Sequence, residues 1–460
     1  MESDTKRINL KREVGLIGCI SFIAGTVIGS GIFISPQFVL AAIGSPGASL
    51  IIWTLCGFIS MLAGLCYAEL GTVIPESGGE FIYILRTAGK VVAFMFSFSF
   101  IVVMRPASAT GVALSFAEYV VAPFYSGCTP PILAVKCIAA AAILGLTAVN
   151  CLSVRLAVRI QVVSMVFKLV ALAVIILGGV VMLFQGHTEN FEEPFENTKA
   201  DVSSIGIAFY QGLWSFEGWN TLNPEVNLPR AVVIAISLVT GLYLLVNVSY
   251  LTVMTPKELM SSSAVAVTWG NKVLGSWGWT MSVAAALSAF GSLNGTFFSG
   301  GRVCFVAARE GHLPDILAMA HVRRLTPSPA LIFTTVVSLL VLIPGDFQSI
   351  VNFFSFTAWF FYGITLSGLV YLKIKKPELP RPYKVPIILP VLVIIVAIFL
   401  VLAPILDNPQ IEYLYVSLFI LSGAIVYVPF IHFKLCPGLL TKLTVFLQLF
   451  LEVAPTEKNL

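Results

Sequence analysis

Apolar residues along this chain gather into long runs separated by short polar connections. Such runs recur from Val14 to Phe433, and most approach the roughly 20 residues that a helix needs to cross the hydrocarbon core of a bilayer. The pattern predicts an all-α polytopic membrane protein with twelve transmembrane helices. The predicted spans are 14–40, 47–74, 91–121, 132–152, 160–184, 204–223, 230–254, 277–303, 329–343, 347–371, 385–405 and 412–433.

Composition supports a membrane protein and leaves no room for a separate soluble domain. Of 460 residues, 58% are hydrophobic and 11% are charged, whereas about a quarter of the residues in a soluble protein are charged. We expect a cytoplasmic N-terminus at 1–13, a single transmembrane transporter domain at 14–433 and a cytoplasmic tail at 434–460. The polar N-terminus lacks the features of a signal peptide, so the first span is expected to be retained.

The positions of Lys and Arg predict the orientation of the spans. With the N-terminus inside, 21 of the 27 basic residues fall in cytoplasmic segments, four fall in outer segments and two fall within spans. Cytoplasmic loops of membrane proteins carry such an excess of Lys and Arg. Both termini are therefore expected to be cytoplasmic.

The first span contains a glycine-rich stretch that favours a break in the helix. Gly29, Ser30 and Gly31 lie in mid-span, and each glycine weakens a helix by about 1 kcal/mol relative to alanine. A broken helix exposes backbone N–H groups and the positive end of a half-helix, which suit a carboxylate. The alternative is that these small residues only permit close packing between helices.

Among the charged residues within predicted spans, three are candidates for a functional role. Glu217 lies in the sixth span beside Gly218, where a second break is expected, and an ionisable residue inside a span favours a functional role. Two interrupted spans at corresponding positions of the two halves are typical of a transporter site. Lys168, near the middle of the fifth span, favours a functional role. Arg105 is either a cation facing a polar cavity or a side chain that snorkels to the membrane surface.

Cysteine positions and the lack of enzyme motifs narrow the functional class. Cys128 lies in a short outer loop, on the oxidising side of the membrane, where a disulfide can form. Its only nearby candidate partner in the chain is Cys137, so a bond to another chain is the alternative that we favour. The sequence contains no metal-binding spacing and no catalytic motif. We expect no enzyme activity, no metal and no cofactor.

Seven motifs, in order along the chain, resemble one family of transporters. The resemblance is to the L-type light subunits of heteromeric amino-acid transporters, above all to the exchanger for cystine, dibasic and neutral amino acids and its aromatic-preferring relative. It implies an APC/LeuT-like five-plus-five inverted repeat with discontinuous helices 1 and 6, and sodium-independent exchange. The motifs are GTVIGSGIFISP, YAELGTVIPESGGEF, APFYSGC, YQGLWSFEGWN, NLPRA, AAREGHLP and FFSFTAWFFYG.

The resemblance also implies the roles of individual residues. Trp214 matches an aromatic gate over the substrate, and Glu217 matches an acidic position facing a basic substrate side chain. Lys168 matches a lysine that takes the place of a sodium ion. Cys128 matches the cysteine bonded to a single-span glycoprotein heavy subunit, with an rBAT-like partner favoured, which carries the pair to the plasma membrane. An apical position in epithelia is left open. The residues implied to meet the substrate carboxylate are Val27, Ile28, Gly29, Ser30 and Gly31.

Two departures from the family pattern leave other functions open. Glu217 is one methylene longer than the aspartate of the dibasic branch, which reduces the space for a cationic side chain. After Asn223, about two turns of helix are missing compared with the family. The alternatives are therefore a sodium-coupled amino-acid symporter of the same fold and a non-transporting membrane subunit that only binds the heavy chain.

Overall fold

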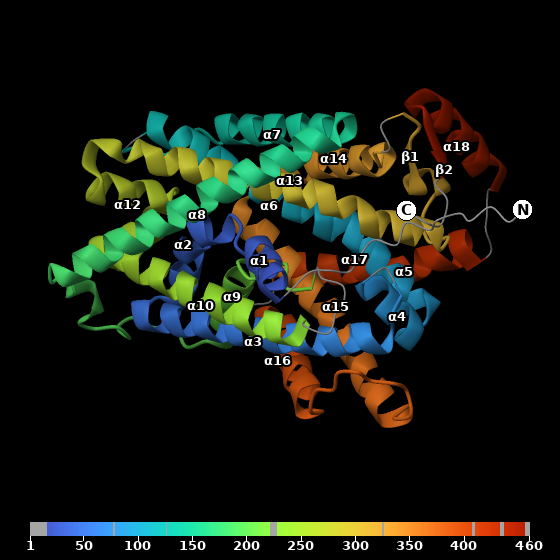
Figure 1. Cartoon of the computed structure of the whole chain (residues 1–460), viewed down its shortest axis with the longest axis horizontal. Helices are drawn as coiled ribbons and strands as arrows, with labels where there is room; N and C mark the ends of the chain where they lie inside the picture. Colours follow the sequence, from blue (N-terminus) through green and yellow to red (C-terminus); the bar gives the residue numbers. More distant parts are fainter. Residues whose placement is uncertain are drawn as a thin grey trace, which may run out of the picture.

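Long helices that lie side by side form the body of the molecule (Figure 1). The structure is a computed structural model, and it describes residues 16–76, 79–125, 127–220, 228–323, 326–406, 410–432 and 437–455. Asn223, and with it the predicted gap in the sixth span, lies outside the described residues. Strands contribute only one short pair to the part of the chain that the structure describes.

The elements follow one another in a nearly uninterrupted series of helices. In chain order they are α1 (Leu16–Val27), α2 (Gly31–Ile43), α3 (Pro46–Val73), α4 (Glu80–Ala88), α5 (Lys90–Ser99), η1 (Phe100–Met104), α6 (Arg105–Val121), η2 (Ala122–Phe124), α7 (Ile132–Leu152), α8 (Val154–Phe184), η3 (Glu189–Phe191), α9 (Val202–Trp214), α10 (Leu228–Val253), α11 (Pro256–Ser261), α12 (Val265–Val273), η4 (Gly275–Trp277), α13 (Trp279–Arg309), η5 (Asp315–Ala318), β1 (Met319–His321), α14 (Ser328–Leu342), α15 (Phe347–Lys375), α16 (Ile388–Leu406), α17 (Ile411–Tyr427), η6 (Val428–His432), α18 (Pro437–Leu451) and β2 (Val453–Pro455).

Within the described residues, every predicted span coincides with one helix or with consecutive helical segments. Within the described ranges, eight helices are long and apolar enough to cross a membrane, and the bent pair α1–α2 makes a ninth. The three remaining predicted spans correspond to α9, α13 and α14, of which α9 and α14 have 13 and 15 residues. The prediction of a polytopic all-α fold is confirmed.

Small residues allow several of these helices to approach one another closely. A Cβ atom on Gly64 of α3 would lie 2.9 Å from the side chain of Val232 on α10. On the other side of the molecule, a Cβ atom on Gly178 of α8 would lie 2.5 Å from the ring of Trp269 on α12. Packing of this kind stabilises helices in a bilayer, where the hydrophobic effect between them is weak.

The C-terminal segment returns to the body of the molecule through a short sheet. β1 and β2 pair antiparallel, with Ala320 opposite Ala454. Between the last span and β2 lies α18, which stands beside β1 at the edge of the molecule in Figure 1. Its apolar side chains are exposed, including Leu443, Phe446 and Phe450.

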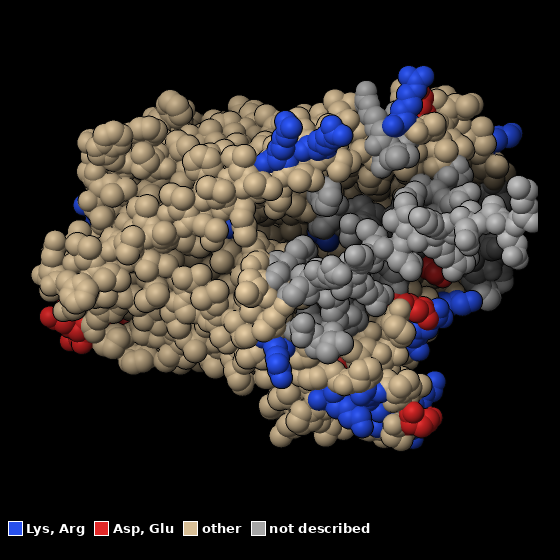
Figure 2. All heavy atoms as spheres, viewed as in Figure 1, with Lys and Arg blue, Asp and Glu red and all other residues tan. Residues whose placement is uncertain are grey.

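Charged side chains are unevenly distributed over the surface. Figure 2 shows Lys and Arg mainly over the half of the molecule that carries α4, α18 and the α15–α16 connection, and an acidic patch at the opposite end. The end of α15 and its connection to α16 together contain five basic residues between 373 and 384, whereas the segment after α8 contains four glutamates between 189 and 196. Basic and acidic residues therefore gather at opposite ends of the molecule, as expected for a membrane protein with an excess of Lys and Arg in the loops on one side.

Candidate functional site

The first predicted span is interrupted where the glycines predicted a break. α1 ends at Val27 and α2 begins at Gly31, and the two helices are bent by 53° relative to each other. Ser30 lies at the N-cap of α2, but its side chain forms no capping hydrogen bond with the described residues. The first N–H groups of a helix have no partner within that helix. The start of α2 therefore offers backbone donors together with the positive end of a helix dipole.

A second interruption comes after α9. The helix ends at Trp214, and the backbone N–H groups of Ser215, Phe216 and Glu217 then bond to carbonyls only three residues back. The helix thus ends three residues before Glu217, the first residue of the predicted break. Gly218 has φ of +114°, a conformation that glycine adopts at much lower cost than other residues. The residues that follow, 221–227, lie outside the described part of the chain.

The two interruptions are in direct contact. A Cβ atom on Gly31 would lie 2.8 Å from the Cα atom of Ser215, and one on Gly218 would lie 2.9 Å from the side chain of Thr26. Each interruption therefore contributes a glycine at which the other backbone passes too closely for a side chain. Residues separated by almost 200 positions in the sequence form one site.

Tyr243 of α10 joins the two interruptions by hydrogen bonding. Its hydroxyl lies 3.1 Å from the carbonyl oxygen of Val27 and 2.8 Å from that of Ser215. The Tyr243 side chain is fully buried, and its ring packs edge-on against Trp53 and Phe216. A helix that ends in the apolar interior leaves carbonyl oxygens without helical partners, and the single O–H donor of Tyr243 lies within hydrogen-bond distance of both.

Trp214 lies at the end of α9, between α6 and α15. Its ring packs edge-on against Phe354 and Phe347, with centroids 5.1 and 6.3 Å away. On the other side, a Cβ atom on Gly111 of α6 would lie 3.5 Å from the Trp214 ring. The indole therefore stands at the edge of the interruption, with 7% of its surface exposed.

Glu217 has a direct partner on α15. The hydroxyl of Tyr362 donates to a carboxylate oxygen of Glu217 over 2.8 Å. The Tyr362 ring is surrounded by other aromatic rings, with Trp219 and Trp359 centroids 5.0 and 5.1 Å away. Tyr67 of α3 packs edge-on against Trp219 at 4.8 Å. The carboxylate thus lies beside an aromatic wall built from α3, α15 and the segment after α9.

A second carboxylate and a guanidinium lie near Glu217. Asn220 donates to the carboxylate of Glu80, at the start of α4, over 2.6 Å. Arg105, at the junction of η1 and α6, interacts electrostatically with Tyr362, Glu80 and Glu217, and its guanidinium stands 5.0 Å over the ring of Phe100. Arg105 therefore faces polar groups in the interior, which favours the first of its two predicted positions.

Lys168 lies on α8 beside the first interruption. The side chain is buried, and its ammonium nitrogen lies 3.5 Å from the carbonyl oxygen of Gly25. The helices touch at this level, since a Cβ atom on Gly25 would lie 2.5 Å from Met165. The positive charge of Lys168 therefore reaches the backbone of α1 about one turn before the break.

Cys128 lies apart from this site. It is exposed in the segment between η2 and α7, and within the described residues neither Cys128 nor Cys137 forms a disulfide. The structure therefore leaves the Cys128 thiol available to a partner outside the chain.

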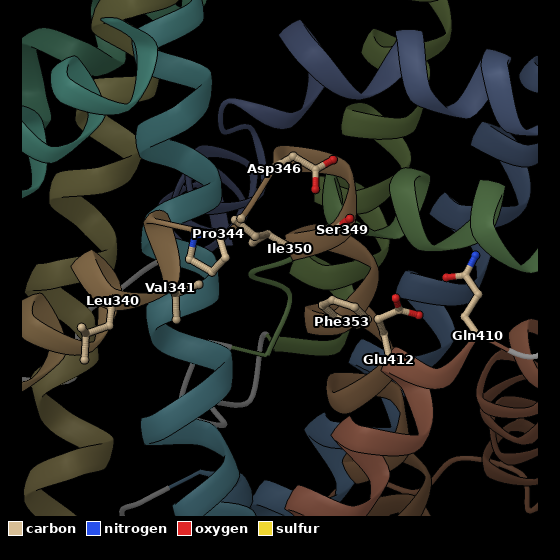
Figure 3. Close-up of a pocket in the computed structure, with 10 residues that line it drawn as sticks. Leu340, Val341, Pro344, Asp346, Ser349, Ile350, Phe353, Gln410 and Glu412 are labelled. Carbon is tan, nitrogen blue, oxygen red and sulfur yellow. The ribbon is translucent and has the colours of Figure 1, made fainter. Parts of the chain in front are cut away.

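A surface cavity lies elsewhere, between the ends of α14, α15 and α17. Figure 3 shows it, with Asp346 and Glu412 among its polar residues. Its volume is about 550 Å³, and none of the predicted site residues lines it. The structure therefore gathers the predicted substrate residues at the two interruptions rather than in this cavity.

Sequence reasoning missed the residues that connect the elements of the site. Tyr243, Tyr362 and Asn220 each place a polar tip inside an apolar span or beside one. Buried tyrosine hydroxyls and amides usually have a hydrogen-bond partner, which was the available signal. The sequence alone did not say which partner each of them has.

Comparison with known proteins gives consistent matches over almost the whole chain. A family model described as amino acid permease matches residues 14–430. The chain is 49% identical over 467 residues to b(0,+)-type amino acid transporter 1 of Mus musculus, which covers 99% of this chain and 96% of that protein. The Homo sapiens counterpart is 48% identical over 466 residues, with the same coverage. Large neutral amino acids transporter small subunit 2 of Homo sapiens is 42% identical over 419 residues, 87% of this chain and 77% of that protein.

Proposed function

The chain belongs to the amino acid permease family, and from that premise we propose that it is a sodium-independent amino-acid antiporter acting as the light subunit of a heterodimer. The observation that carries the proposal is the meeting of the two interruptions, with Gly31 against Ser215 and Gly218 against Thr26. Discontinuous helices of this kind form the substrate site of transporters with internal repeats. The names of its relatives supply the substrate class, amino acids.

The substrate carboxylate is assigned to the first interruption. The backbone from the end of α1 to the start of α2 consists of Val27, Ile28, Gly29, Ser30 and Gly31. At the start of α2 the helix dipole favours an anion. Gly29 also lies close to α13, because a Cβ atom there would stand 3.3 Å from the hydroxyl of Ser292. A side chain at Gly29 or Gly31 would therefore fill the space beside these donors.

The substrate side chain is assigned to the second interruption. Trp214 stands at the edge of that break and acts as the aromatic gate, and Glu217 supplies a carboxylate for a cationic side chain. The aromatic wall around Tyr362 suits neutral and aromatic side chains as well. We therefore propose neutral, dibasic and cystine-like substrates, with the order among them set by how Glu217 is shared with Tyr362.

Sodium independence rests on Lys168. Its ammonium group, 3.5 Å from the Gly25 carbonyl, supplies a fixed positive charge beside the first break. Oxygen groups of the protein are the usual ligands of hard cations, and here a carbonyl oxygen already faces a cation of the chain. We propose that Lys168 takes the place of a sodium ion.

The partner is assigned through Cys128. Cys128 is exposed, and the predicted orientation puts it on the side of the membrane where disulfides persist. This supports a covalent bond to a single-span glycoprotein of the rBAT type, in the plasma membrane and with both termini in the cytoplasm. Cys128→Ser should abolish a reducible heterodimer on non-reducing gels. The matched variant Cys137→Ser, also at an exposed cysteine, should retain it. A heterodimer that persists in Cys128→Ser would exclude this linkage.

One observation favours a second candidate function, a non-transporting membrane subunit. Only five residues, 219–223, lie between Gly218, whose φ of +114° is outside the helical range, and Pro224, a residue that breaks a helix. Half of a bilayer core of about 30 Å needs about ten helical residues at 1.5 Å each, which is more than this segment supplies. A chain without a complete second half of the sixth span could pair with the heavy subunit and fail to transport.

Uptake measurements distinguish these functions. Labelled leucine and arginine are supplied to cells that express the chain with each candidate heavy subunit, in media with and without sodium, while surface labelling measures the heterodimer. Uptake that is the same without sodium supports the antiporter. Uptake that requires sodium identifies a symporter. A heterodimer at the surface without uptake identifies the non-transporting subunit.

A further inference from the structure

A buried ion cluster lies at the end of α3 that is predicted to face the cytoplasm. Glu69 is fully buried, and one carboxylate oxygen lies 2.8 Å from the ammonium nitrogen of Lys373 and 3.6 Å from Nε of Arg381. The other oxygen accepts a hydrogen bond of 3.2 Å from the backbone N–H of Val385. One carboxylate on α3 therefore holds both the end of α15 and the segment after it.

The two cations are fixed on their own side as well. Lys373 also donates to the carbonyl oxygen of Val385 over 2.6 Å. Arg381 donates to the carbonyl oxygens of Leu372 and Lys376 over 2.7 and 3.1 Å. The end of α15 and the first turn of the α15–α16 connection thus form one folded unit, and Glu69 anchors that unit to α3.

The same face of α15 carries the partner of Glu217. Lys373 lies 11 residues after Tyr362, which is three helical turns plus about 20°, so both side chains leave α15 on nearly the same side. Tyr362 packs edge-on against Tyr67 of α3, with centroids 6.1 Å apart, and donates to Glu217. The contact between α3 and α15 therefore has two bridges, one at the substrate side-chain subsite and one at Glu69.

Both helices pack mainly against other neighbours. α3 lies chiefly along α10, and α15 lies chiefly along α16. Helices in a membrane can slide and tilt where apolar surfaces alone are in contact, whereas polar groups in the interior require their partners. A buried ion pair is a costly way to gain stability but an effective way to fix a register.

We propose that Glu69 is a positioning residue for substrate selection: by anchoring Lys373 it fixes the register of α15 against α3 and so places the Tyr362 hydroxyl on Glu217. The inference rests on the proposed antiporter function. It assigns the Glu69 cluster a role in the ratio of cationic to neutral substrates, beyond a role in folding.

The test is a double-mutant cycle with the Michaelis constants for arginine and leucine as the readout. Lys373→Gln removes the tether of α15 while Arg381 still compensates Glu69, and Tyr362→Phe removes the hydroxyl that Lys373 positions. Each single variant should shift the ratio of the two Michaelis constants in the same direction, by about tenfold for the loss of a hydrogen bond to a charged group. The double variant should shift it no further than either single variant.

The controls separate this inference from the proposed function. Lys375→Gln changes an exposed lysine in the same turn of α15 and should leave the ratio unchanged. Glu69→Asp keeps the charge and should restore most of the ratio that Glu69→Gln loses. Two results would overturn the inference. One is a double variant in which the effects of Lys373→Gln and Tyr362→Phe on the ratio of Michaelis constants multiply. The other is a Lys373→Gln variant with an unaltered ratio. Absence of uptake by the unsubstituted chain would instead overturn the proposed function.

Discussion

The hydroxyl of Tyr243 lies 2.8 Å from the carbonyl oxygen of Ser215 and 3.1 Å from that of Val27. One side chain of α10 thus connects the ends of both half-helices. Because those carbonyls lie in an apolar interior, each needs a donor. Together with the contacts at Gly31 and Gly218, this phenol group therefore helps to fix the position of one interruption relative to the other.

Tyr243→Phe removes this donor and keeps the ring. We expect the unfolding free energy to fall by about 1–3 kcal/mol, the cost of leaving a buried acceptor unsatisfied, and transport to fall with it. Thermal unfolding of the purified protein and uptake per surface molecule measure the two effects. Tyr371→Phe is the matched control, because Tyr371 is exposed on α15. Equal stability of the two variants would show that Tyr243 does not join the breaks.

Gly218→Ala tests the close approach of the two interruptions. Gly218 has φ of +114°, and a Cβ atom would lie 2.9 Å from Thr26. A positive φ costs alanine about 1–2 kcal/mol, and the contact adds to it, so we expect lower thermal stability and little uptake. Gly145→Ala on α7 meets no atom within 4 Å, and it should be neutral or stabilising. A Gly218→Ala protein that transports normally would contradict the contact.

Glu217→Gln removes the charge of the side-chain subsite and keeps its shape. We expect uptake of arginine to fall about tenfold or more relative to leucine, as for the loss of a hydrogen-bonded charge pair. Competition between the two labelled amino acids in one assay measures the ratio. Glu412→Gln, at the exposed residue of the surface cavity (Figure 3), is the control and should leave the ratio unaltered. An equal loss for both substrates would exclude a side-chain role for Glu217.

We expect His312 to make the stability of the protein depend on pH. It lies after α13, edge-on against Phe81 with centroids 5.1 Å apart and near Phe94 at 5.9 Å. Burial, with a smaller effect of Lys90, lowers the pKa of His312 below 6.5. The folded protein therefore binds this proton more weakly than the unfolded chain, and stability is lost as the pH falls below about 6.5.

The check is the midpoint of thermal unfolding between pH 7.5 and pH 5.5 for the unsubstituted protein and His312→Phe. The substitution keeps an aromatic ring among its neighbours and should reduce the loss at low pH. His187→Phe changes an exposed histidine. Its unfolding midpoint should fall with pH as steeply as that of the unsubstituted protein. Parallel slopes for all three proteins would mean that His312 does not titrate in the folded state.

The spans and the first break could be predicted because each depends on a local property. Span length follows from the thickness of the bilayer, and the interruption at Gly29 follows from the weakness of glycine in a helix. The second break lies two residues earlier than predicted, at Ser215, because the adjacent backbone of Gly31 and the donor Tyr243 come from other spans. Local sequence does not carry that information.

The partners of the charged residues could not be predicted for the same reason. Hydropathy gives the length of a span but not its rotation or tilt, which neighbouring helices determine. Glu217 was found as a charge within a span, whereas its partner Tyr362 lies 145 positions away on α15. Glu69 lies in a quoted motif, yet its pairing with Lys373 required the fold. The sodium-replacing role of Lys168 and the identity of the partner of Cys128 came from the family resemblance and remain proposals.

The most direct test of antiport is efflux from preloaded cells. Cells that express the chain with its heavy subunit are loaded with labelled leucine and transferred to sodium-free medium, with or without external arginine or leucine. We predict little efflux into medium without amino acids and a several-fold rise when either is added. The reason is that the substrate site of an exchanger moves back across the membrane only when an amino acid is bound to it. Efflux that is equal in both media, or that requires sodium, would contradict sodium-independent exchange.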